Sequence, residues 1–111
     1  MVAGEIQGEF EHHVLLAALR LEGRAYTSAL VVELEERTGR EVSPAAVYIA
    51  LRRLEKKELV RSELRTGEEG GRRRERRFFR VTPAGVTALR ESRAKLRRLW
   101  EGLDPRLAGG G

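Results

Sequence analysis

The sequence predicts a mostly α-helical fold with one β-hairpin and a long last helix. Three observations support this prediction. Apolar residues recur at helical spacing in three short segments before residue 58. Charged and apolar residues then alternate on both sides of a Gly-containing stretch, which is typical of two antiparallel strands. An amphipathic segment follows Thr82, a predicted N-cap, and Pro83 at the first helical position. The complete order is that of a winged helix-turn-helix plus a C-terminal dimerisation helix.

The length and composition fit one small domain with an appended helix. The 111 residues divide into an expected flexible N-terminus (1–8), the winged helix-turn-helix (9–82), the dimerisation helix (83–103) and a disordered tail (104–111). Cysteine is absent, which excludes disulfides, thiolate metal sites and a thiol nucleophile. No apolar run approaches the roughly 20 residues of a membrane span, and no signal peptide is visible. We therefore expect a cytoplasmic protein with no membrane partner.

Positive charge is concentrated in the second part of the chain. The net charge of +5 combines −4 for residues 1–39 with +9 for residues 40–111. With a pI near 10.4, this basic part suggests a polyanionic partner. Only three of the 22 basic residues are lysine. The planar fork of arginine suits phosphate and guanine, although a GC-rich gene gives the same bias.

The N-terminal part predicts two short helices. The first covers 8–23 and carries Phe10 and Val14 on its apolar stripe. His12 and His13 are adjacent, so on a helix they diverge by about 100° and do not easily share a metal ion. A solvated or interface role is expected for them.

The second helix is expected over 26–38, with Thr27 or Ser28 as its N-cap and Gly39 as its end. A short link then leads to Ser43. Two short helices joined by a turn that contains glycine form a candidate helix-turn-helix.

The stretch Ser43–Lys57 predicts the third helix. Ser43 is a favourable N-cap and Pro44 suits the first helical position. One face is apolar, and the other combines small, apolar, aromatic and cationic side chains: Ala45, Tyr48, Ile49, Arg52 and Lys56. Such a surface suits a DNA major groove. The alternative is a core helix with a solvated basic face.

Two strands are expected over 59–65 and 72–81, with a flexible loop over 66–71. Between Arg72 and Arg80 the chain has six Arg and one Glu, whereas a solvated charge run usually mixes signs. Arginine in such a hairpin suits phosphates or the minor groove. The candidates are Arg72, Arg73, Arg74, Arg76 and Arg77. The alternative is a loop that only increases solubility.

The last helix carries large apolar residues at nearly heptad spacing: Leu89, Leu96, Leu99, Trp100 and Leu103. A monomer this small leaves them uncovered unless the first helix or another chain packs on them. Together with Phe10 and Val14 they are the predicted dimer interface. For Trp100 two interpretations remain, namely interface packing and a stacking platform for a planar ligand.

Three blocks of sequence stand in an informative order: FEHHVLLAAL with Tyr26, VYIALRRLEKKELV and FFRVTPAG. They resemble the PadR family of bacterial transcriptional regulators over about Glu9 to Gly85. Three positions depart from the family's pattern. Thr27 stands where the family usually has Gly, Ile49 where it frequently has Pro, and Glu58 where it usually has Gly. Glu58 matters most, because a glycine there usually takes a positive φ.

The resemblance implies a homodimeric repressor of the family's short-tailed branch and a response to a small aromatic or cationic effector. In such a dimer, two symmetry-related helices would read a pseudo-palindromic double-stranded DNA operator with half-sites roughly one helical turn apart. We expect no cofactor. Within the third helix, Tyr48 and Arg52 would contact bases or phosphates, and Arg53 and Lys56 would flank the backbone. Ala45 and Ile49 would meet thymine methyl groups.

Other classes remain open at this point. A winged helix that binds a protein instead of DNA could use its Glu-rich second helix, and an RNA-binding variant is a third option. An enzyme has the least support, because there is no Cys and no candidate catalytic or metal cluster. The sequence does not name the operator, the regulated genes or the effector, and it does not separate activator from repressor.

Overall fold

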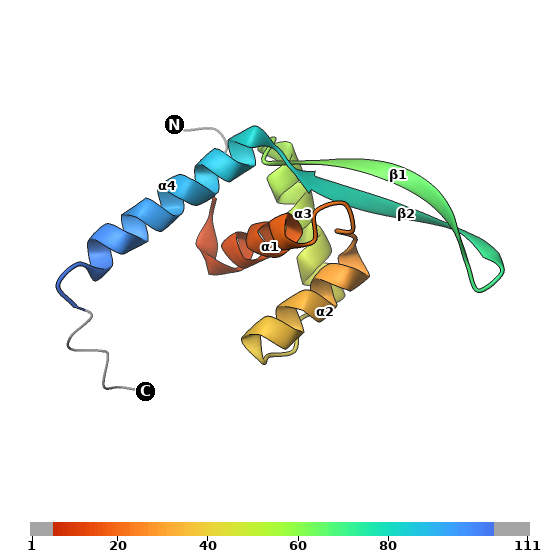
Figure 1. Cartoon of the computed structure of the whole chain (residues 1–111), viewed down its shortest axis with the longest axis horizontal. Helices are drawn as coiled ribbons and strands as arrows, with labels where there is room; N and C mark the ends of the chain where they lie inside the picture. The colour runs from red at the N-terminus through yellow and green to blue at the C-terminus, as the bar shows by residue number, and fades with distance from the viewer. Residues whose placement is uncertain (1–5, 104–111) are drawn as a thin grey trace.

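The computed structural model describes residues 6–103 and confirms the predicted fold class. The expectations for 1–5 and for 104–111 fall outside the described residues. The elements, labelled in Figure 1, are α1 (Gly8–Arg20), α2 (Thr27–Thr38), α3 (Pro44–Lys56), β1 (Val60–Glu69), β2 (Arg72–Val81) and α4 (Pro83–Trp100). Ile6, expected to be loose, is half-buried against the core.

The core lies where α1, α2 and α3 meet the base of the hairpin. Leu15, Leu30, Leu51, Leu54 and Phe79 are its largest buried side chains, and each is almost fully excluded from solvent. Burial of such side chains contributes about 1.5–3 kcal/mol each relative to exposure.

The hairpin is also tied to the helices by its backbone. The Phe79 amide donates to the Ala25 carbonyl oxygen at 2.8 Å, so the link between α1 and α2 pairs with β2. This bond places the wing, defined here as residues 60–81, directly against the three-helix core.

Two of the predicted helix caps are confirmed. Ser43 Oγ accepts from the Ala46 amide at 3.2 Å, and Thr82 Oγ1 accepts from the Gly85 amide at 3.0 Å. The N-cap prediction for α2 is wrong, because Thr27 is already helical and Tyr26 takes the cap position without a side-chain bond. The first helix also ends earlier than predicted, at Arg20.

The wing is a continuous two-stranded ribbon, so the predicted loop at 66–71 is wrong. Pairing runs without interruption from Val60 opposite Val81 to Glu69 opposite Arg72. Gly70 and Gly71 form the turn with φ of 58° and 81°. Two successive residues with positive φ make the tight hairpin turn that matches strand twist. The strands therefore continue to the tip.

The junction of α3, β1 and α4 is built around Glu58. Glu58 has a φ of 63° and is the one non-glycine residue with a positive φ in the described part of the chain. Its carbonyl oxygen accepts from Thr82 Oγ1 at 2.7 Å, and the Thr82 amide donates to the Leu59 carbonyl oxygen at 3.0 Å. The left-handed conformation usual for glycine at this exit is thus adopted by a glutamate.

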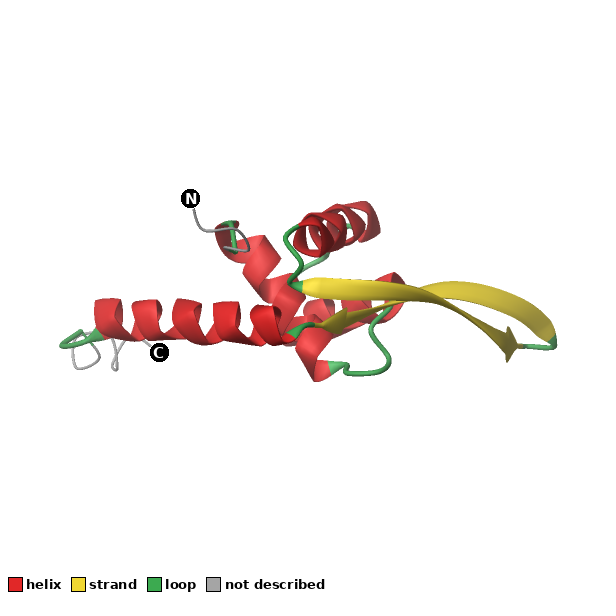
Figure 2. Cartoon of the chain, turned by 90° about the horizontal axis from the view of Figure 1, so that it is seen from above, coloured by secondary structure: helices red, strands yellow, loops and turns green. Residues whose placement is uncertain are grey.

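The molecule is elongated, because α4 and the wing project from the core in opposite directions (Figures 1 and 2). Its extents are 55 × 35 × 20 Å and its radius of gyration is 16.1 Å. A compact chain of this length has a radius of gyration of about 13 Å. Among the described helices, none is both long and apolar enough to cross a membrane.

Candidate nucleic-acid interface

The two faces of α3 differ as the sequence predicted. Val47, Leu51 and Leu54 are fully buried, and Ala50 is nearly so. All six residues named as candidates on this helix are exposed: Ala45, Tyr48, Ile49, Arg52, Arg53 and Lys56. Tyr48 keeps 42% of its surface accessible, so its ring and hydroxyl group can be reached by a ligand.

The turn between α2 and α3 is fixed by the side chain of Glu35 on α2. Glu35 Oε2 accepts from the Val42 amide at 2.9 Å. Gly39 ends α2 with a φ of 72°, and its amide donates to the Glu35 carbonyl oxygen. Side chain and backbone of one residue therefore define the angle at which α3 leaves α2.

The other end of α3 is held by a mostly buried ion pair. Lys57 Nζ lies 2.7 Å from Glu11 Oε1, and Glu11 is only 6% exposed. The Gln7 amide also donates to this oxygen at 3.1 Å. Removing one partner of such a pair leaves an uncompensated buried charge. The contact joins residues 46 positions apart, so spacing along the chain gave no signal for it.

The five wing arginines form two groups. Arg72, Arg73 and Arg74 are exposed near the tip, whereas Arg76 and Arg77 are half-buried near the core. The Arg76 guanidinium lies 4.3 Å from the centre of the Tyr26 ring. Arg77 Nη1 donates to Ser62 Oγ at 3.0 Å. The structure thus brings only the first group to the open end of the wing.

Aromatic and cationic side chains join the base of the wing to the link between α1 and α2. The Tyr26 and Phe78 rings meet edge to face at 5.3 Å, and the Arg65 guanidinium lies 4.4 Å from the centre of Phe78. Such contacts contribute about 0.5–1.5 kcal/mol each.

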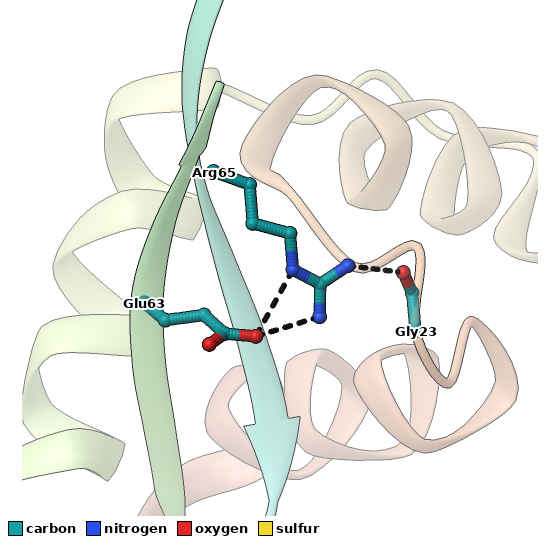
Figure 3. Close-up of polar contacts among 3 residues, drawn as sticks. All are labelled: Gly23, Glu63 and Arg65. Atoms are coloured by element: carbon teal, nitrogen blue, oxygen red, sulfur yellow. Dashed lines mark hydrogen bonds and ion pairs between the residues drawn. The ribbon is translucent and has the colours of Figure 1, made fainter. Parts of the chain in front are cut away.

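Arg65 adds polar contacts to the same region (Figure 3). Its guanidinium donates to the Gly23 carbonyl oxygen at 3.1 Å and to Glu63 Oε1 at 2.8 and 3.0 Å. These hydrogen bonds and the adjacent positive charge hold the pKa of the Glu63 carboxyl below its usual value. Arg65 therefore fixes the wing instead of extending into solvent.

The wing as a whole is less positively charged than β2 alone, because β1 contributes acidic residues. β2 carries most of the arginines, but β1 places Glu68 opposite Arg73. Alternation along β2 puts Arg72, Arg74 and Arg76 on one face and Arg73 and Arg77 on the other. The face with Arg72 and Arg74 is the more cationic one.

The predicted interface residues fall into two classes. Val14 and Leu89 are buried inside the chain itself, because they pack in its own core. The others are exposed: Phe10, Leu96, Leu99, Trp100 and Leu103. Leu16 and Leu19 of α1 are also exposed, although the sequence analysis did not assign them to an interface.

The histidine pair lies where α1 approaches α4. His12 Nδ1 is 3.4 Å from Ser92 Oγ on α4. Burial, and secondarily the charge of His13, lowers the pKa of His12. Within residues 6–103 there is no group of three side chains that could ligate a metal ion.

A family model described as the transcriptional regulator PadR-like family matches residues 15–91. The chain belongs to this family. Membership makes it a PadR-like transcriptional regulator, which implies DNA binding and assigns the chain to a non-enzymatic class.

Solved structures of PadR-like proteins and of another transcriptional regulator share the fold. A regulator from Eggerthella lenta is 32% identical with a TM-score of 0.66, covering 85% of this chain and 80% of its own. A PadR-like factor from Bacteroides fragilis is 24% identical with a TM-score of 0.71 and covers 86% of each chain. A transcriptional regulator from Thermoplasma acidophilum is 22% identical with a TM-score of 0.68, and the match covers 89% of this chain and 95% of that protein. No curated protein matches the chain.

Proposed function

We propose that this PadR-like protein is a homodimeric repressor that binds a pseudo-palindromic DNA operator and is released by a small-molecule effector. The observation that carries the proposal is the exposed face of α3. An aromatic ring, an aliphatic side chain and cations lie together on a helix whose opposite face is buried. Such a helix fits the major groove and presents donors to base edges.

Each exposed residue of α3 has a chemical role in this proposal. Tyr48 and Arg52 contact bases or phosphates, because both side chains are exposed and carry hydrogen-bond donors. Ala45 and Ile49 meet thymine methyl groups. Arg53 and Lys56 contact the backbone, and the tip arginines Arg72, Arg73 and Arg74 reach phosphates or the minor groove.

The dimer is proposed from the uncovered part of α4. After Leu89 no described residue of this helix is buried, although Leu96, Leu99 and Trp100 are large and apolar. A helix without tertiary cover is marginal in water. A second copy that supplies the same face, together with Phe10 of α1, covers both helices symmetrically.

An effector that stacks on Trp100 is the remaining part of the proposal. Trp100 is half-exposed at the end of α4, so a planar aromatic or cationic compound can reach its ring. Release of the protein from DNA by such a compound supports this part. If the compound changed neither DNA binding nor tryptophan fluorescence, the effector part of the proposal would be wrong.

The double variant Tyr48→Ala/Arg52→Ala tests the DNA contact. We expect loss of sequence-specific binding to the DNA upstream of the protein's own gene, because two contacts worth about 1–3 kcal/mol each are removed. Fluorescence anisotropy measures the affinity, and light scattering checks that the oligomeric mass is unchanged.

The matched control is Arg20→Ala, which removes an exposed cation from α1. It is expected to keep nearly the full affinity. Unchanged affinity of the double variant would exclude α3 as the recognition helix and would favour a winged helix that binds another protein.

A further inference from the structure

We propose that Glu55, Ser62 and Arg77, here named the wing brace, set the angle between α3 and the wing during DNA binding. In this proposal Arg77 is a positioning residue and not a phosphate contact. The inference rests on the proposed DNA-binding function and changes the role of one arginine within it.

The wing brace joins three elements through one hydroxyl group. Ser62 Oγ of β1 donates to Glu55 Oε2 of α3 at 2.5 Å. Arg77 Nη1 of β2 donates to the same Ser62 Oγ at 3.0 Å. A serine hydroxyl has one donor and two acceptor sites, so both bonds form at once without conflict.

The chemistry at each end favours this arrangement over solvation. Glu55, Ser62 and Arg77 are all half-buried, so each has lost part of its hydration, and the hydrogen bonds of the brace compensate for this loss. Hydrogen bonds that involve a charged group are about twice as strong as neutral ones. The guanidinium of Arg77 is therefore directed at β1 and is not extended like a side chain at the tip.

The brace also reaches the DNA-facing side of α3. The second oxygen of the same carboxylate, Glu55 Oε1, lies 3.8 Å from Arg52 Nη1. Arg52 is a proposed contact to bases or phosphates, so the carboxylate of Glu55 links the recognition surface to the wing. Arg73, on the same face of β2 as Arg77, is exposed and has no such link in its described contacts.

A double-mutant cycle between Ser62→Ala and Arg77→Ala tests the proposal. Binding to the upstream duplex is measured against salt concentration. Arg77→Ala removes one hydrogen bond of the brace and is expected to weaken binding by roughly two- to tenfold. Ser62→Ala removes both hydrogen bonds and should weaken binding at least as much. The double variant should bind no more weakly than Ser62→Ala, because that variant already lacks the contact with Arg77.

The salt dependence separates positioning from phosphate contact. Ser62→Ala breaks the brace but keeps every charge. If Arg77 contacts no phosphate, Arg77→Ala should show the same slope of log affinity against log salt concentration as Ser62→Ala. Arg73→Ala is the control for a phosphate contact and should reduce the slope by about 0.9. The proposal is overturned if the slope for Arg77→Ala is lower by about 0.9 than that for Ser62→Ala and the affinity losses of the two single variants multiply in the double variant.

A measurement without DNA keeps the wing brace testable by itself. Amides of Val60–Leu64 should exchange faster in Ser62→Ala and Arg77→Ala than in the wild type, and at the wild-type rate in Ser62→Thr, which keeps the hydroxyl. Unchanged exchange in the two alanine variants contradicts the brace. If the wild type binds no duplex while exchange behaves as expected, the DNA-binding proposal fails and the brace stands.

Discussion

Glu58 adopts a backbone conformation that is unfavourable for a residue with a side chain. A residue with a Cβ at a φ near 63° pays a steric penalty that glycine avoids. Three hydrogen bonds keep the turn closed despite this penalty: Glu58 amide to Glu55 carbonyl, Thr82 Oγ1 to Glu58 carbonyl and Thr82 amide to Leu59 carbonyl.

Replacing Glu58 with glycine should stabilise the protein. We expect Glu58→Gly to raise the free energy of unfolding by about 1 kcal/mol, because the steric penalty of the left-handed conformation is removed. Urea denaturation measures this change. Glu36→Gly in the exposed part of α2 is the matched control and should lower the free energy by about 1 kcal/mol. Equal losses in both variants would show that Glu58 is not strained.

At the scale of residues, the sequence predicted what depends on near neighbours. Ser43 and Thr82 cap their helices as expected, because a cap and its acceptor lie within one turn. Glu11 and Ser62 were missed, because their partners lie on other elements and polar residues give no periodic signal when buried.

Among the elements, α4 depends on a close approach to the start of β1. A Cβ built on Gly85 would lie 2.3 Å from the Leu59 carbonyl oxygen and 2.7 Å from Val81 Cγ1. The first contact is with backbone, so it cannot be relieved by a side-chain rotation. Glycine at this position lets the first turn of α4 pack against the wing.

Gly85→Ala should therefore weaken the packing of α4. We expect a loss of about 1–3 kcal/mol in the free energy of unfolding, the usual range for overpacking. Thermal denaturation followed by circular dichroism measures it. Gly67→Ala is the control, because a Cβ at Gly67 meets no atom within 4 Å. A loss for Gly85→Ala no larger than that for Gly67→Ala would contradict the prediction.

The strands illustrate what pattern alone leaves open. Alternation predicted both strands near the core, where Val60 and Phe79 are buried. It failed over 66–71, because two exposed strands need no apolar residue and their Gly and Glu content is also typical of loops. Only the pairing register revealed the length of the ribbon.

At the scale of the whole molecule, the projecting helix carries exposed large apolar side chains. Leu99 is 72% exposed, and no residue of α4 after Leu89 is buried. Periodicity could identify this apolar face but could not separate residues of the chain's own core from residues for a partner. That is why Val14 and Leu89 were assigned to the interface although they are buried within one chain.

Leu99→Arg should convert the proposed dimer into a monomer. A charge at the centre of an apolar contact loses its hydration, which no partner group replaces. Size-exclusion chromatography with light scattering at micromolar concentration is expected to show half the wild-type mass. Val32→Arg changes an exposed apolar position on α2, where 53% of the Val32 surface is accessible, and it should keep the dimer mass. A monomeric wild type with folded α4 would refute the interface itself.

The unbroken pairing of the wing also has a consequence for the spacing of binding sites on a chromosome. Ten-residue strands with a two-residue turn extend about 33 Å, close to one helical turn of DNA. In the proposed dimer with half-sites one turn apart, wings that lay along the DNA on both flanks would enlarge the occupied segment to about 30 base pairs. Two such operators closer than that would compete for the same DNA, so the proposed dimer would limit how densely this regulator occupies a promoter.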